Sequence, residues 1–155
     1  IGEFHRLQSG PKTVGGGPME IERQVATAPE FHETVRYWAA LGLLAQPDLA
    51  SDGAAGDALR EMLGDQDAAC RIAAAEAVVH HGVGSTDKAI AELVTEARRG
   101  DAATRWLAIN ALDRLKDRVE PAVAETLRFL LAETPSDWID RSVQATVWSL
   151  LNPSK

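Results

Sequence analysis

The sequence has 155 residues, of which 45% are hydrophobic and 25% are charged, and these values are typical of one globular domain. Its formal net charge of −7 argues against general nucleic-acid binding, which needs basic residues to displace counterions. Alanine is abundant and aromatic residues make up only 5%, which favours closely packed helices over a β-sandwich. No run of about 18 apolar residues occurs, so we expect no transmembrane helix and no membrane partner.

Residues 1–18 are rich in glycine and proline and show no sustained hydrophobic period. Gly2–Phe4 and Gly15–Gly17 are typical of a cloning scar and a linker. We therefore interpret residues 1–18 as vector-derived or flexible linker sequence and residues 19–152 as the folded domain. The alternative is a short native arm that packs on the first helices.

From Pro18 onward, segments with helical periodicity alternate with turns marked by glycine and proline. We predict helices over residues 19–27, 30–45, 52–63, 67–81, 86–99, 101–116, 120–133 and 137–151. Gly100 is suited to end the helix over residues 86–99 in a left-handed conformation. No segment has the pattern of a strand. The sequence thus predicts an all-α fold of about four antiparallel helix pairs.

One pattern recurs at the start of the second helix of each predicted pair. An arginine stands at position 36, 71, 105 and 141, with spacings of 35, 34 and 36 residues, and small side chains mostly follow it. Self-similarity at a fixed period indicates a repeat array. Because one helix pair cannot bury its apolar faces alone, we expect the pairs to stack into a right-handed α-solenoid.

Three of these arginines follow an aspartate by four residues, in the pairs Asp67/Arg71, Asp101/Arg105 and Asp137/Arg141. Each aspartate is suited to cap its helix N-terminus, and each arginine lies one turn later. The pairs are either isolated surface contacts, worth about 0.3–0.5 kcal/mol each, or a structural ladder that links neighbouring repeats. In a stack of repeats, each pair can reach the pair of the next repeat.

An Asp-x-x-x-Arg motif that opens an alanine-rich second helix, after a leucine-rich first helix, resembles the HEAT repeat. The resemblance covers Met19 to Asn152. It implies an α-solenoid that serves as a binding scaffold. With the repeated stacking geometry, it also leads us to expect that the Asp/Arg pairs form the ladder between repeats. The stretches Val35–Leu44, Arg71–Ala77 and Ala108–Asp113 are similar to the HEAT-like tail that follows the catalytic domain of some bacterial sulfatases.

The sulfatase resemblance implies that a catalytic domain lies upstream of this sequence. Such sulfatases carry Cys/Ser-x-Pro-x-Arg, whose first residue becomes a formylglycine. The nearest string here, Ser9–Thr13, lacks the arginine, and we interpret it as coincidence. We therefore expect this chain to be no enzyme, to need no cofactor and to hydrolyse no sulfate ester.

Other chemistry has little support in the sequence. Glu76 and His80 can share a helix face, but a metal site needs three or four converging ligands, and no third is evident. The lone Cys70 rules out an intrachain disulfide and lies among alanines, where we expect a small buried hydrophobe. HEAT-like arrays also occur in metal hydroxylases and bilin lyases, and an enzyme of that kind is our third alternative. Such hydroxylases need several His-Glu pairs, whereas this sequence has one, His32-Glu33.

Aromatic residues next to the repeat arginines are the candidates for a partner surface. Tyr37, Trp38 and Trp106 occupy these positions, where packing in the core is the commoner role and exposure would indicate a partner contact. We predict a non-catalytic interaction or accessory domain whose partner is a protein or peptide. The alternative to a sulfatase tail is a free-standing scaffold that binds along the face lined by the second helices.

Overall fold

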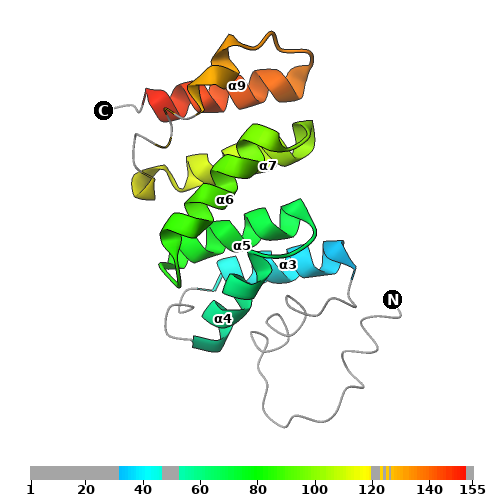
Figure 1. The fold of residues 1–155 in the computed structure, drawn as a ribbon, viewed down its shortest axis with the longest axis vertical. Helices are drawn as coiled ribbons and strands as arrows, with labels where there is room; N and C mark the ends of the chain where they lie inside the picture. Colours follow the sequence, from blue (N-terminus) through cyan, green and yellow to red (C-terminus); the bar gives the residue numbers. More distant parts are fainter. Residues whose placement is uncertain (1–31, 47–52, 120–122, 124, 126, 153–155) are drawn as a thin grey trace.

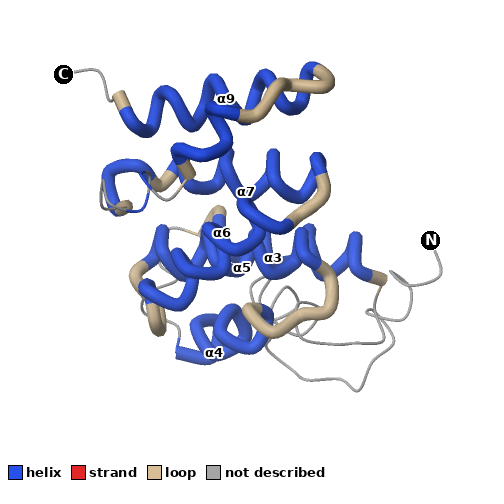
Figure 2. Tube along the Cα trace, turned by 45° about the horizontal axis from the view of Figure 1, so that its top comes forward, coloured by secondary structure: helices blue, strands red, loops and turns tan. Residues whose placement is uncertain are grey.

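The computed structural model describes residues 32–46, 53–119, 123, 125 and 127–152. Every regular element within these ranges is helical, which confirms the all-α prediction for this part of the chain (Figures 1 and 2). In chain order the elements are α3 (Glu33–Leu44), α4 (Gly53–Met62), α5 (Ala68–His81), α6 (Thr86–Arg99), α7 (Ala102–Arg114), the 3-10 segments η2 (Lys116–Arg118) and η3 (Arg128–Ala132), and α9 (Trp138–Leu151).

The helices pack mostly on their neighbours in the sequence. The second helices of the predicted pairs contact one another in the order α3, α5, α7, α9, while α4 packs on α5, and α6 packs on both α5 and α7. Figure 1 shows these helices piled along the long axis of the molecule, from α4 at one end to α9 at the other. No helix among the described residues is both long and apolar enough to cross a membrane.

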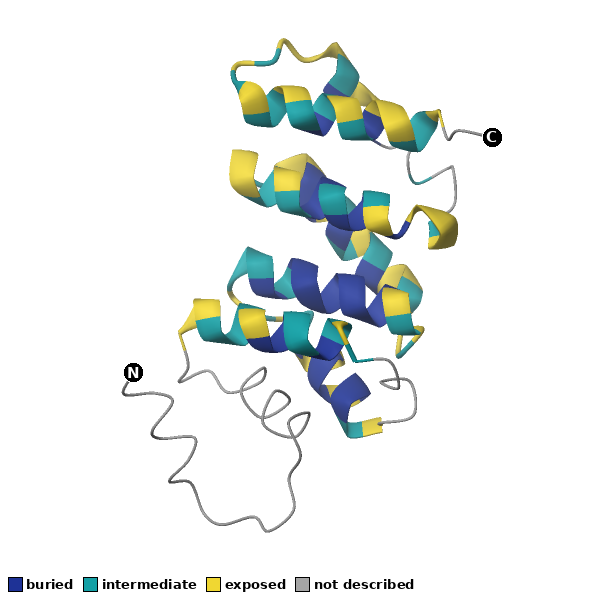
Figure 3. Cartoon of the chain, turned by 180° about the vertical axis from the view of Figure 1, so that it is seen from behind, coloured by how far each residue is buried: buried dark blue, intermediate teal, exposed yellow. Residues whose placement is uncertain are grey.

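Helix α5 is the centre of the core. All eight residues from Ile72 to Val79 are buried, because α3, α4, α6 and α7 surround the helix (Figure 3). Four of these eight are alanines, which let the neighbouring helices approach closely. The sequence motif of small residues after the repeat arginine is therefore used for helix packing.

The predicted N-cap aspartates are confirmed in three helices. Asp67 accepts a hydrogen bond from the Cys70 amide at 3.0 Å, Asp101 from Thr104 at 2.8 Å, and Asp137 from Asp140 at 3.0 Å. Each carboxylate thus satisfies an amide that has no partner within its helix and meets the positive end of the helix dipole. In α3 the side chain of His32 takes this place.

Two local predictions need correction. The last part of the helix predicted over residues 120–133 is the 3-10 segment η3, followed by Pro135, which disfavours a helical conformation at Thr134.

Gly100, expected to end α6 in a left-handed conformation, has φ −63°. A Cβ on Gly100 would lie 2.7 Å from the Glu96 carbonyl oxygen, so close packing explains this glycine. The helix predicted over residues 19–27 lies outside the described residues.

Hydrogen exchange should follow this burial. We expect the amides of Ile72–Val79 in α5 to exchange most slowly, because opening α5 disrupts contacts with four helices. The amides of α9, which packs on α7 and η3, should exchange faster. Amide exchange followed by mass spectrometry or NMR measures both, and protection of α9 equal to that of α5 would contradict this assignment of the core.

Candidate binding surfaces

The repeat arginines link successive helices through carboxylates that follow or end the first helix of the next pair. Arg36 of α3 donates two hydrogen bonds of 2.8 Å to Asp65, in the turn between α4 and α5. Arg105 of α7 donates to Glu133, just after η3, at 3.1 Å. These contacts join residues 29 and 28 positions apart, so they tie one predicted pair to the next.

Arg71 of α5 makes the most extensive of these links. Its guanidinium donates to Glu92 at 2.7 Å and to Glu96, both on α6, and to the carbonyl oxygens of Asp65 at 2.8 Å and Gln66 at 3.0 Å. Only 8% of Glu96 is exposed, so this link is partly shielded from water. Arg71 therefore joins α5, α6 and the turn before α5.

The predicted partners of the arginines are thus wrong. The structure places Arg71 and Arg105 on glutamates, and neither makes an ion pair with Asp67 or Asp101 within the described residues. An N-cap carboxylate is directed at the amides of its own helix, whereas the arginine one turn later extends toward the next helix pair. Arg141 is exposed and has no carboxylate partner in the described part of the chain.

Burial and hydrogen bonding change the acidity of two groups near these links. The hydrogen bonds from Arg36 lower the pKa of Asp65 below its ordinary value of 3.8. Burial raises the pKa of the Cys70 thiol to about 12, and this thiol donates a hydrogen bond to the Glu33 carbonyl oxygen at 3.3 Å. Cys70 is therefore a neutral, buried side chain at neutral pH, with the role that its alanine-rich surroundings predict.

An ion pair between an exposed arginine and a buried glutamate, which the sequence did not reveal, joins α5 to α7. Arg114 donates two hydrogen bonds to Glu76, at 2.5 and 2.6 Å, and Glu76 is 4% exposed. Glu76 therefore forms an ion pair with Arg114 and not with His80. An isolated glutamate in the middle of an alanine-rich helix was the only available signal, since its partner lies 38 residues away.

The predicted partner-surface aromatics fall in two separate places. Trp38 on α3 is 64% exposed and makes an edge contact with Tyr37 at 5.8 Å between ring centroids, while Trp106 on α7 is 37% exposed. Helix α5 lies between α3 and α7. Trp138 and Trp148 are also exposed, on α9.

A groove of about 810 Å³ lies along α6. Its apolar part is formed by Ile90 and Val94, one turn apart on α6, and by Val123. Ile90 and Val94 are half-buried, because the core face of α6 presents Leu93 and Ala97 instead. The sequence places all four α6 residues on one apolar face, and the structure divides them between core and groove.

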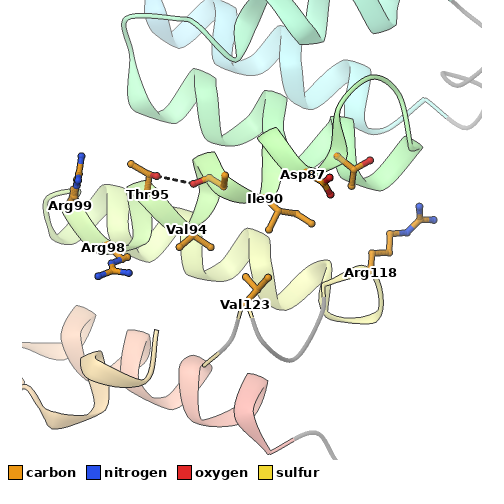
Figure 4. A pocket seen from close by; sticks show the side chains of 10 residues that line it. Asp87, Ile90, Val94, Thr95, Arg98, Arg99, Arg118 and Val123 are labelled. Atoms are coloured by element: carbon orange, nitrogen blue, oxygen red, sulfur yellow. Dashed lines mark hydrogen bonds between the residues drawn. The ribbon is translucent and has the colours of Figure 1, made fainter. Parts of the chain in front are cut away.

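Three arginines border this groove. Arg98 and Arg99 lie at one end and Arg118 at the other, with the apolar side chains between them (Figure 4). Within the described residues none of the three has a carboxylate partner, in contrast to the arginines that form ion pairs, namely Arg36, Arg60, Arg71, Arg105, Arg114 and Arg128.

The other contacts of these arginines leave their charge without a counterion. The Arg98 guanidinium lies 5.3 Å from the centre of the Phe129 ring, and Arg118 donates to the Val79 carbonyl oxygen at 3.3 Å. Among the described lining residues, Asp87 in the first turn of α6 is the acidic one. The groove thus combines an apolar centre with a local excess of positive charge.

In comparisons with known proteins, no protein-family model, no curated protein and no solved structure matches the chain.

The Arg71 link should contribute more to stability than a surface ion pair. Arg71→Ala should lower the free energy of unfolding by about 1–3 kcal/mol, because it leaves Glu96 and two carbonyl oxygens without their donor. The control Arg60→Ala removes an exposed pair with Asp57 and should cost at most about 0.5 kcal/mol. Urea unfolding measures both, and equal costs would show that the link to α6 adds no stability.

The Arg36–Asp65 pair should make stability depend on pH. Because the pKa of Asp65 is lowered in the folded state, its ionised form stabilises the fold above the ordinary value of 3.8. This contribution is lost as the pH falls through the lower, folded-state pKa. Asp65→Asn should therefore destabilise the protein at about pH 7 by about 1–3 kcal/mol, and by less at about pH 3. A difference between variant and wild type that is constant across this range in urea unfolding would refute the assignment.

Proposed function

We propose that this chain is a non-catalytic interaction domain, an α-solenoid of four HEAT-like helix pairs, which binds a segment of a partner protein in the groove along α6. The observation that carries the proposal is the groove itself. Its volume of about 810 Å³ is in the range of sites that bind ligands, and it combines apolar side chains with a few charged groups at its ends.

The polar groups inside the molecule support a binding role over catalysis. Glu76 is held by Arg114, Glu96 by Arg71 and Asp65 by Arg36, so these carboxylates serve helix packing. General acid–base and nucleophilic catalysis need side chains that are free to reach a substrate. Each of these three carboxylates is instead held by an arginine.

The groove is a better candidate than the face lined by the second helices. On that face α5 is the central helix, and its residues from Ile72 to Val79 are all buried. Trp38 and Trp106 therefore stand on either side of a helix that offers little surface to a ligand. The groove along α6, by contrast, has its apolar residues next to one another.

The sequence resemblance further leads us to propose that the domain follows a sulfatase-type catalytic domain in its native protein. The partner segment would then belong to that domain or to a protein associated with it. Sequencing the native gene upstream tests this point. A reading frame without Cys/Ser-x-Pro-x-Arg would refute the sulfatase link and favour a free-standing scaffold.

Selection from a random peptide-display library tests the binding role. Peptides that bind the wild-type protein should lose at least about tenfold in affinity on Val94→Asp, because a carboxylate in the apolar centre must be desolvated by a bound segment. The matched control Ala145→Asp places the same charge on an exposed position of α9 and should leave affinity unchanged.

Fluorescence anisotropy gives the affinities, and circular dichroism shows whether both variants remain folded. If the selected peptides bind Val94→Asp as tightly as wild type, the groove is not the binding site and the proposal fails.

A further inference from the structure

We infer that the segment bound in the α6 groove is acidic, with one or two apolar side chains on Ile90, Val94 and Val123 and carboxylates at Arg98 and Arg99. This inference rests on the proposed function, because it names the chemistry of the partner at the same groove. It follows from three features of the described residues: where the unpaired arginines lie, which elements supply them, and how charge changes along the groove.

The first feature is the position of the arginines without carboxylate partners. The chain has 23 Asp and Glu against 16 Lys and Arg, so carboxylates are in excess. Most arginines in the described residues form ion pairs, yet Arg98, Arg99 and Arg118 do not, and all three line the same groove. Arg141, on α9, is the unpaired arginine outside it.

The second feature is that the arginines come from different elements. Basic residues in the last turn of a helix are favoured by its dipole, and this alone accounts for Arg98 and Arg99 at the end of α6. It does not account for Arg118, which belongs to η2 beyond the end of α7 and still lines the groove from the other side (Figure 4). The tertiary structure therefore brings arginines of two elements, α6 and η2, to one groove.

The third feature is the polarity of the groove. Asp87 lies toward the N-terminal end of α6, whereas Arg98 and Arg99 stand together at its C-terminal end, where none of the described lining residues is acidic. The phenyl ring of Phe129 lies against Arg98 and holds its guanidinium without neutralising it. The strongest attraction for carboxylates is thus at the C-terminal end of α6.

The geometry sets the spacing in the bound segment. Val94 and Arg98 are one helical turn apart, or about 6 Å, and Ile90 and Arg98 are about 12 Å apart along the helix axis. An extended segment advances about 3.3 Å per residue. Its acidic residues should therefore lie two to four positions from its apolar anchor. A basic segment would place like charges against Arg98 and Arg99 and be rejected.

The test uses peptides selected on the wild-type protein whose binding is lost on Val94→Asp, so that only groove-bound peptides are compared. Each is synthesised as selected, with its acidic residues changed to the corresponding amides, and with them changed to lysine. We expect the acidic form to bind tightest and the lysine form to bind weakest. Anisotropy at about 0.05 M and about 0.5 M salt should show the acidic peptide weakening as salt screens the charges.

Substitutions of the groove arginines test the same charge pairing in the protein. The double variant Arg98→Gln/Arg99→Gln should bind the acidic peptide about 5- to 30-fold more weakly at low salt, the effect of losing two partly exposed charge pairs. The single control Arg141→Gln removes an unpaired arginine far along the chain and should leave the affinity for the acidic peptide within about twofold of wild type. The affinity of Arg98→Gln/Arg99→Gln for the amide peptide should also stay within about twofold of wild type.

The possible outcomes separate this inference from the proposed function. Groove-bound peptides that are neutral or basic, or whose affinity is the same for wild type and Arg98→Gln/Arg99→Gln, would overturn the acidic partner and leave the binding groove in place. Displacement of the acidic peptides by a short single-stranded oligonucleotide would also overturn it in favour of a nucleic-acid ligand. A library that yields no groove-bound peptide would instead overturn the proposed function.

Discussion

The burial of α5 on all sides is the constraint on which the rest of the structure depends. Short side chains let the surrounding helices approach closely, and alanines stand at positions 73, 74, 75 and 77 of α5. Larger side chains in the neighbours, such as Leu43, Leu93 and Leu112, fill the remaining space. Because α5 contacts α3, α4, α6 and α7, its position determines theirs.

The arginine–carboxylate links add directional contacts to this apolar packing. Apolar packing is tolerant of small shifts along a helix axis, whereas two parallel hydrogen bonds from a guanidinium to a carboxylate are not. Arg36 makes such a contact with Asp65, whereas Arg71 donates to two separate glutamates of α6 and Arg105 donates one hydrogen bond to Glu133. The Glu76–Arg114 pair adds a bidentate contact between α5 and α7.

The groove along α6 is a consequence of these constraints. Leu93 and Ala97 are drawn into the core by contacts with α5 and α7, and Glu96 turns toward Arg71. That orientation leaves Ile90 and Val94 on the flank of the helix, half-buried and next to arginines whose charge is not needed for packing. A surface suited to binding thus arises beside the contacts that hold the array together.

The sequence by itself determined the helical class, the approximate positions of α3 to α7 and α9, and the caps at Asp67, Asp101 and Asp137, because these depend on hydrophobic period and on hydrogen bonds within three or four residues. It also indicated which small residues pack between helices. Only the tertiary structure decided the partners of Arg71 and Glu76, which lie 21 to 38 residues away, and the exposure of Trp38. Ile90 and Leu93 belong to the same periodic pattern, so only the contacts of α6 with its neighbours decided which would enter the core and which would line a groove.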